Sequence, residues 1–236
     1  MQINFKALLA EFIGTFALVF VGALAVVVAS NVALTEGGNL LGVTIAALAH
    51  GLILVALIYT FGHYSGAHFN PAVTAGLLVG GKIAVVSAVG YWVAQFLGGI
   101  VAGFAALALS APAGLTGVGE TIGLLTVDHL GTAAILEAVL TFFLVTTIYQ
   151  SAVYGKGGQF AGVAIGLMLA ACIFAGGVFT GASLNPARTL GPALAAGNFS
   201  YVPMYLIGIF AGGIVAGLLN AFVLKPPSEP AAPPLP

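Results

Sequence analysis

Charged residues are scarce in this sequence. Only 5% of its 236 residues are Asp, Glu, Lys or Arg, whereas about 25% of a typical soluble domain is charged. Hydrophobic residues make up 61% of the chain, and its mean hydropathy is +1.17. The formal net charge of −1 excludes a bulk electrostatic role such as nucleic-acid binding. We therefore expect a membrane protein whose surroundings are the lipid bilayer.

Cysteine is also nearly missing, since Cys172 is the single one and lies in an apolar run. One cysteine excludes an intrachain disulfide and a cysteine-based metal cluster, and we expect it to be a small packing residue. Enzyme motifs such as Gly-x-Ser-x-Gly and His-Glu-x-x-His do not occur in the sequence. The chain is therefore not predicted to be an enzyme, and no metal or cofactor is expected.

Long apolar stretches fill most of the chain, and six of them are long enough to cross about 30 Å of hydrocarbon as helices. They cover about residues 5–29, 41–62, 84–109, 130–153, 160–178 and 202–223. Two further apolar stretches are too short to cross, and Asn-Pro opens each of them: about 70–79 and 186–195. We predict an all-α polytopic membrane protein with six transmembrane helices plus two re-entrant half-helices. It forms one domain over residues 1–224, followed by a disordered Pro-rich tail over 225–236.

The lysines give this layout an orientation. Lys6, Lys82, Lys156 and Lys225 all fall on the same side of a membrane crossed six times in this way. Because Lys and Arg are enriched on the cytoplasmic side of membranes, we predict that both termini are cytoplasmic. The protein is expected in the plasma (cell inner) membrane.

An internal repeat links the two halves of the chain. The stretch Gly66–Thr74 reads GAHFNPAVT and Gly181–Thr189 reads GASLNPART, with six of nine positions identical. A second similarity aligns Glu11 with Glu137 and several residues after each. The repeats cover about residues 5–110 and 130–223. Because each contains three spans, an odd number, the second half is predicted to lie inverted relative to the first, with the transport site where the short segments meet.

The two Asn-Pro pairs predict how the short segments begin. Asn is a favoured N-cap, and Pro suits the first helical residue, so Asn70-Pro71 and Asn185-Pro186 each start a half-helix. Approaching from opposite faces, both N-termini meet near the midplane, and each carries roughly +0.5 elementary charge. Each Asn amide retains donors for a permeant molecule. A water held through its oxygen by two such donors cannot accept a proton from its neighbours.

The loops before the half-helices are expected to supply carbonyl acceptors for the permeant. Non-helical backbone survives at membrane depth only where protein or a water-filled cavity surrounds it. The loop residues predicted to line the pore in this way are Gly66, Ala67, His68, Gly181 and Ser183.

Three charged residues fall at membrane depth. Arg188 is the single arginine of the sequence, and we expect it in the pore wall, where it repels cations and narrows the outer mouth. Glu11 and Glu137 occupy equivalent places in the repeat. We favour a structural role for both, as buried acceptors for backbone N–H groups of the two loops, over a proton relay.

Together these residues resemble the aquaporin (major intrinsic protein) family, whose hallmark is two Asn-Pro-Ala boxes. The boxes here are Asn70-Pro71-Ala72 and Asn185-Pro186-Ala187, the second extended to Arg188. The resemblance covers about residues 5–223 and implies a homotetramer with one water pore in each subunit. The short termini and loops are similar to those of prokaryotic members.

The resemblance also implies a selectivity filter, formed here by His50, Ile173, Ala182 and Arg188. Strict water channels usually have Phe and His where this sequence has His50 and Ile173. The set resembles that of plant tonoplast intrinsic proteins, some of which also admit ammonia, urea or hydrogen peroxide. Losing an aromatic ring and a second imidazole is expected to widen the constriction. The predicted function is thus a passive channel for water, and for such small neutral solutes, that excludes protons and ions.

Two alternatives remain open at this stage. One is a glycerol or small-solute facilitator of the same family, although glycerol-conducting members usually carry Asp where Thr189 follows the arginine. The other is a secondary transporter, which would need coupling-ion ligands near the midplane; only Glu11 and Glu137 qualify.

Three histidines outside the filter have open roles. His63 and His68 precede Asn70, where a pH gate and plain loop contacts are both consistent with the sequence, the contacts being favoured. His129 is expected near the outer surface, as an interfacial residue.

Overall fold

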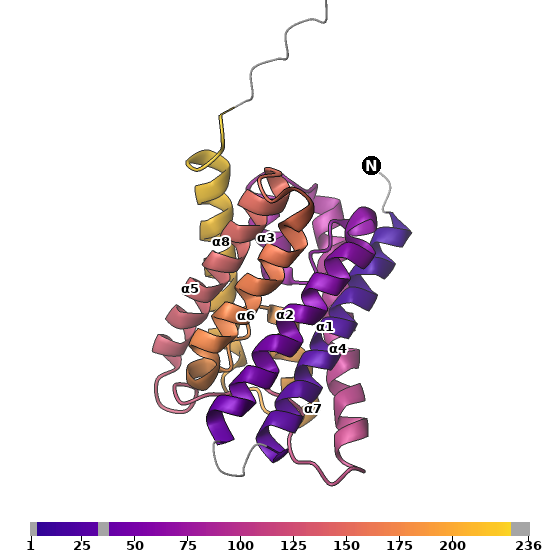
Figure 1. Ribbon diagram of the computed structural model, residues 1–236, viewed down its shortest axis with the longest axis vertical. Coiled ribbons are helices and arrows are strands. Elements are labelled where there is room, and N and C mark those ends of the chain that lie inside the picture. The colour runs from indigo at the N-terminus through magenta and orange to yellow at the C-terminus, as the bar shows by residue number, and fades with distance from the viewer. Residues whose placement is uncertain (1–3, 33–37, 228–236) are drawn as a thin grey trace, which may run out of the picture.

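The computed structural model describes residues 4–32 and 38–227, and within them the chain is a bundle of eight α-helices without strands (Figure 1). Six helices are long and apolar enough to cross a membrane. Their bounds are α1 Phe5–Val32, α2 Gly38–Ser65, α4 Val85–Ser110, α5 Leu130–Ile148, α6 Ala161–Thr180 and α8 Val202–Phe222. The predicted all-α fold with six spans is therefore confirmed. The predicted disorder of the tail falls mostly on residues 228–236, which lie outside the described residues.

The two remaining helices are the short ones, α3 (Pro71–Val79) and α7 (Pro186–Ala196). At 1.5 Å per residue, nine and 11 residues reach only about 14 and 17 Å, roughly half of a bilayer core. Figure 1 shows α3 in the upper half of the bundle and α7 in the lower half. Each is preceded by a non-helical segment, which the long helices surround.

Helix packing follows the inverted repeat. In the first half α1 packs on α2 and α4, and in the second half α5 packs on α6 and α8 in the same way. The two halves join through α2 against α6. Each half-helix also crosses over, since α3 packs on α8 and α7 packs on α4. Neither half of the chain therefore encloses its own short helix.

Glycines permit this crossed packing. A Cβ added at Gly213 of α8 would lie 2.6 Å from the carbonyl oxygen of Ala72 in α3, and one added at Gly99 of α4 would lie 2.6 Å from that of Ala187 in α7. Real Cβ atoms do not approach backbone so closely, so only glycine lets these helices meet. The two contacts correspond to each other in the repeat, which shows that the halves share their packing as well as their motifs.

Two features have no precedent in the predicted layout. The last turn of the fourth span, Tyr149–Val153, is a π-helix (η1), and a 3₁₀ turn (η2, Gly158–Phe160) precedes α6.

The connection between α4 and α5 is hydrogen-bonded to the end of α6. The Leu124 N–H donates to the Val178 carbonyl (3.0 Å), and the Leu125 N–H donates to the Phe179 carbonyl (2.8 Å). These connections close the two ends of the bundle.

The outer surface of the bundle is apolar. Large hydrophobic side chains that face outwards include Leu52, Val93, Ile135 and Ile207, each more than half exposed. In water such a surface would drive association, whereas lipid tails solvate it. The chain is therefore built as an integral, multi-pass membrane protein.

Replacing Gly213 by Val is expected to push α3 away from α8, because the added Cβ meets the Ala72 carbonyl. We expect a loss of several degrees in thermal unfolding temperature of the detergent-solubilised protein, as typically follows overpacking. The matched control is Gly131→Ala, where a Cβ has open space. A Gly213→Val protein with the melting temperature of the control would contradict this packing account.

Candidate functional site

Both half-helices begin with an asparagine N-cap. Asn70 and Asn185 have extended backbone (φ −154° and −145°), and each side-chain Oδ1 accepts a hydrogen bond at 2.9 Å from the backbone N–H two residues on. Pro71 and Pro186 follow as the first helical residues. At this position the helix makes no hydrogen bond from the backbone N–H, so proline loses nothing by lacking one. Each asparagine oxygen is therefore directed back at its own helix, and each amide NH2 is directed away from it.

The two caps are joined by an exchange of hydrogen bonds. Asn70 Nδ2 donates to the carbonyl of Leu184 at 2.8 Å, and Asn185 Nδ2 donates to the carbonyl of Phe69 at 2.9 Å. Each asparagine thus binds the residue that precedes the other. An amide NH2 carries two hydrogens, so one remains on each side chain, and both side chains line the same cavity. The N-termini of α3 and α7 therefore meet in the interior with two free donors.

The loops before the caps have unusual backbone conformations. Ala67, Phe69, Ala182 and Leu184 all have positive φ, at 53°, 48°, 44° and 53°. Non-glycine residues rarely adopt this region, and it costs about 1–3 kcal/mol each where it occurs. Among the described residues, no hydrogen bond goes to the carbonyls that belong to residues 66–68 and 181–183. The loops are held in a strained form that leaves these acceptors available.

Glu11 holds the first loop. Its Oε1 accepts from the His68 backbone N–H (2.9 Å) and the Ser65 hydroxyl (2.6 Å), while Oε2 accepts from the Phe69 N–H (2.7 Å) and Gln95 Nε2 (2.8 Å). The side chain is fully buried in α1. Four donors satisfy a carboxylate that would otherwise be costly to bury, and no lone pair is directed into the cavity.

Glu137 holds the second loop in the same manner. Oε1 accepts from the Ser183 N–H (3.0 Å) and the Thr180 hydroxyl (2.7 Å), and Oε2 accepts from the Leu184 N–H (2.9 Å). It is also fully buried. The two carboxylates are thus placed as anchors of the loop backbone, the role that the sequence favoured for them.

Arg188 lies in the first turn of α7, and its exposed fraction is only 2%. Its Nε donates to His50 Nε2 at 3.1 Å, and no described group accepts from its NH1. Because arginine has only donors, His50 Nε2 must be the acceptor, so the imidazole carries its proton on Nδ1 and donates it to the Ala46 carbonyl (2.7 Å). His50 is therefore neutral with both nitrogens occupied, and Arg188 supplies the free donor.

A passage built in this way has buried donors, free carbonyls in the two loops and a fixed cation. Comparison with known proteins decides what kind of passage it is. The Major intrinsic protein family matches residues 2–220.

The chain belongs to the major intrinsic protein family.

Similar proteins extend this assignment. The channel is 39% identical over 237 residues to "Aquaporin TIP2-3" of Zea mays, covering 96% of this chain and 91% of the maize protein. It is 37% identical over 229 residues to "Aquaporin TIP2-1" of Arabidopsis thaliana, covering 96% and 90%. Its fold matches the X-ray structure of the aquaglyceroporin from Plasmodium falciparum with a TM-score of 0.77 at 25% identity, over 93% and 96% of the two chains. The protein is thus a membrane channel of aquaporin type and not an enzyme.

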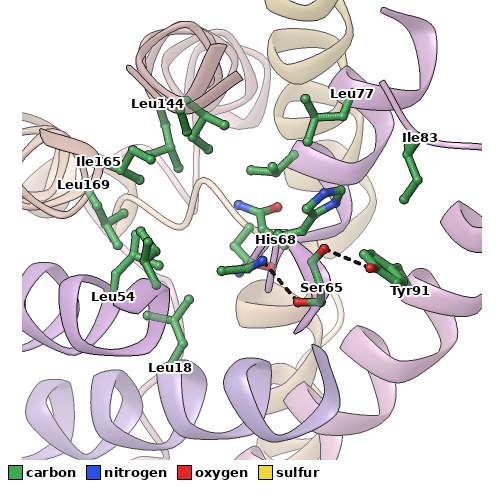
Figure 2. A pocket seen from close by; sticks show the side chains of 18 of the residues that line it. Leu18, Leu54, Ser65, His68, Leu77, Ile83, Tyr91, Leu144, Ile165 and Leu169 are labelled. Atoms are coloured by element: carbon green, nitrogen blue, oxygen red, sulfur yellow. Dashed lines mark hydrogen bonds between the residues drawn. The ribbon is translucent and has the colours of Figure 1, made fainter. Parts of the chain in front are cut away.

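The cavity that both asparagine caps line, called the main cavity from here on, has a volume of about 550 Å³. Figure 2 shows its two sides: Leu18, Leu54, Leu144, Ile165 and Leu169 form an apolar wall, and Ser65, His68 and Tyr91 lie opposite. Tyr91 donates to the Ser65 carbonyl at 2.8 Å and thereby braces the loop. With one apolar wall, a water in this cavity finds hydrogen-bond partners on the other side and in the waters next to it.

A second cavity of about 590 Å³ lies beyond the predicted filter. Ile173 and Gly181 line it, together with the carboxylates of Glu120 and Asp128. Asn198 Nδ2 donates to Glu120 at 3.1 Å. Partial burial raises the pKa of Glu120, against the opposing effects of this hydrogen bond and of the Arg188 charge.

Three of the four predicted filter residues line one cavity or the other. His50 and Arg188 line the main cavity, Ile173 lines the second, and Ala182 is buried and lines neither. Of the predicted loop residues, Gly66, Ala67, His68 and Ser183 line the main cavity, and Gly181 lines the second. The structure thus divides the sequence-predicted residues between two cavities, and their role as a filter stays a prediction.

The other histidines make local contacts. His68 Nδ1 lies 2.9 Å from the Thr74 hydroxyl, and its ring packs edge-on against Tyr91. The His63 ring lies 3.9 Å from that of Tyr64. His129 precedes α5, where its carbonyl accepts from the Ala133 N–H.

Sequence reasoning missed the glycines that make room for the site. A Cβ atom added at Gly22 would collide with the His50 ring, and a Cβ atom added at Gly14 would collide with the Phe69 ring. Both lie in α1, which also carries Glu11 and the cavity-lining Leu18. Lys82 and Ile83, which follow α3, also line the main cavity and were not singled out as site residues.

Glu137→Gln is expected to destabilise the second loop. Glutamine keeps one acceptor oxygen, so either the Leu184 or the Ser183 N–H loses its partner, at about 1–3 kcal/mol. We expect a lower thermal unfolding temperature and slower solute passage. Asp128→Asn, an exposed carboxylate, is the control for thermal stability. An unfolding temperature of Glu137→Gln equal to that of the control would show that the loop does not depend on this anchor.

Proposed function

We propose that this channel conducts water passively and excludes protons and other ions. The observation that carries the proposal is the pair of free amide donors, Asn70 Nδ2 and Asn185 Nδ2, at the meeting point of two helix N-termini. A water held there through its oxygen donates outwards on both sides. It therefore cannot relay a proton, and the positive ends of the half-helices repel cations.

We propose further that small neutral solutes such as ammonia, urea or hydrogen peroxide also pass. Support comes from the His50 and Ile173 pair, which places an aliphatic side chain where strict water channels usually carry a histidine. Because both nitrogens of His50 are occupied, a solute in the filter meets one free donor group, Arg188, and needs only an acceptor. Water, ammonia and urea all provide one.

A glycerol facilitator is the second candidate, and one observation favours it: the fold matches a solved aquaglyceroporin. Thr189 after Arg188 favours water over glycerol. A secondary transporter is disfavoured, because Glu11 and Glu137 already accept hydrogen bonds from the loops and cannot serve as ion ligands without releasing them.

We also propose a homotetramer with both termini cytoplasmic. The position of the four lysines at one end of the bundle supports the orientation. The plasma membrane stays a prediction, and the similarity to TIP-type aquaporins favours an internal membrane instead.

Purified protein in liposomes is expected to speed osmotic shrinkage well above empty vesicles without raising proton conductance. Stopped-flow light scattering measures the first quantity, and a pH dye trapped in the vesicles measures the second. Shrinkage no faster than in empty vesicles would contradict the proposed function.

The double variant His50→Phe with Ile173→His is expected to suppress ammonia and urea flux while keeping water flux, because two rings narrow the filter. The panel of water, glycerol, urea and ammonia permeabilities, measured in one vesicle preparation for the wild type and the variant, tests this. Solute permeabilities equal to the wild type would refute the role of the filter pair.

A further inference from the structure

The charged side chains that line the main cavity are both cationic. Arg188 lies at the end next to the second cavity, and Lys82 lies at the other end, beyond the C-terminus of α3. The lining contains no Asp or Glu. Of the carboxylates in the described residues, Glu11 and Glu137 are fully buried behind the loops, and Glu120 and Asp128 line the second cavity. The charge of Lys82 is therefore not neutralised from the cavity wall.

A tight turn fixes the backbone of Lys82 at this end. The Gly81 N–H donates to the Leu78 carbonyl at 3.0 Å and the Lys82 N–H donates to the Leu77 carbonyl at 2.8 Å, which closes the last turn of α3. Gly81 has φ +69°, a conformation that a side chain would strain. Ile83 and Ala84 continue along the cavity wall. Lys82 is thus part of the rim and not of a free loop.

Tyr154 fixes the side chain of Lys82. The ammonium Nζ lies 5.3 Å from the centroid of the Tyr154 ring, within cation–π range. The ring itself is held, because its hydroxyl donates to the Asn220 carbonyl at 2.7 Å and its centroid lies 5.8 Å from that of Tyr149. The π-helix of residues 149–153 leads directly into Tyr154 and lines the same cavity through Ala152 and Val153.

A lysine at a membrane surface often only reaches for lipid headgroups. Lys82 differs, because it lines the cavity and its ammonium lies over the ring of Tyr154, which is itself hydrogen-bonded to the Asn220 carbonyl. We propose that Lys82, held by Tyr154, is a second specificity-determining charge, which repels cations at the mouth opposite to Arg188. The proposal rests on the proposed channel function and adds a barrier that the filter and the asparagines do not provide.

The size of the effect follows from Coulomb's law. A unit charge about 6 Å from the axis of a water-filled mouth changes the local concentration of monovalent cations by about threefold. Reversing the charge changes it by about tenfold. Salt weakens the effect once the Debye length falls below that distance, near 3 Å at 1 M.

The test uses a background in which the Arg188 barrier is removed. Arg188→Val gives the second repeat the residue that the first repeat carries at the matching place, Val73. Lys82→Gln, Lys82→Glu and Lys82→Arg are added singly to this variant. Lys6→Gln, a lysine of the same face that does not line the cavity, is the matched control. Proton influx driven by a potassium diffusion potential is measured in proteoliposomes, and osmotic water flow in the same vesicles normalises each rate to the number of working pores.

We expect normalised proton influx to rise about threefold with Lys82→Gln and about tenfold with Lys82→Glu at low salt, and to stay unchanged with Lys82→Arg and Lys6→Gln. The differences should vanish in 1 M salt. If Arg188→Val alone does not leak, a leak that begins with Lys82→Glu supports the proposal equally. Proton influx that is the same for Gln, Glu and Lys at position 82, with water flow present, overturns it. Absence of water flow in the wild type would instead overturn the channel function itself.

Discussion

Two stretches of non-helical backbone at membrane depth are the constraint on which this structure depends. Inside a bilayer core, a backbone N–H group without a hydrogen-bond partner costs several kcal/mol, because no bulk water is available to it. Glu11 and Glu137 supply the missing partners from the side away from the cavity. In each carboxylate both oxygens accept backbone N–H groups of the loop, and Oε1 also accepts a hydroxyl group. With the N–H groups bound on one side, the carbonyls are left on the other. The acceptors that line the passage are therefore a consequence of how the loops are held.

The repeat is symmetric in its scaffold and asymmetric in its lining. The carboxylate anchors, the caps and the glycine contacts correspond pairwise between the halves. Arg188 stands where the first repeat has Val73, and Ser183 stands where it has His68. Duplication thus explains the strength of the framework, and the substitutions at these few places decide what the framework admits. A channel with the same packing could acquire another preference through changes at such places alone.

The sequence predicted most of the fold because its signals were local and repeated. Uninterrupted apolar runs indicated the spans, and Asn70 and Asn185 indicated the starts of the half-helices with the correct bounds to within a residue. The sequence could not single out Gly22, because the chain contains 34 glycines. Only its neighbour in space, the His50 ring, distinguishes this glycine from the others. The bond between Arg188 and His50 joins residues 138 positions apart, and no local pattern reports such a distance. The π-helix at Tyr149–Val153 likewise contains no residue type from which it could be predicted.

The crossed bonds between the caps also have a consequence for the order in which the molecule is assembled. Asn70 takes its partner from Leu184, 114 residues later in the chain, and α3 packs on the last span. At a synthesis rate of about 5–20 residues per second, this partner is made about 6–23 seconds after Asn70. During that interval α3 lacks its contact with α8, and the amide of Asn70 lacks its acceptor, the Leu184 carbonyl. The polar loop before α3 must therefore persist without these contacts until the second half is made. The final packing of α3 therefore waits until the second half of the chain has been made.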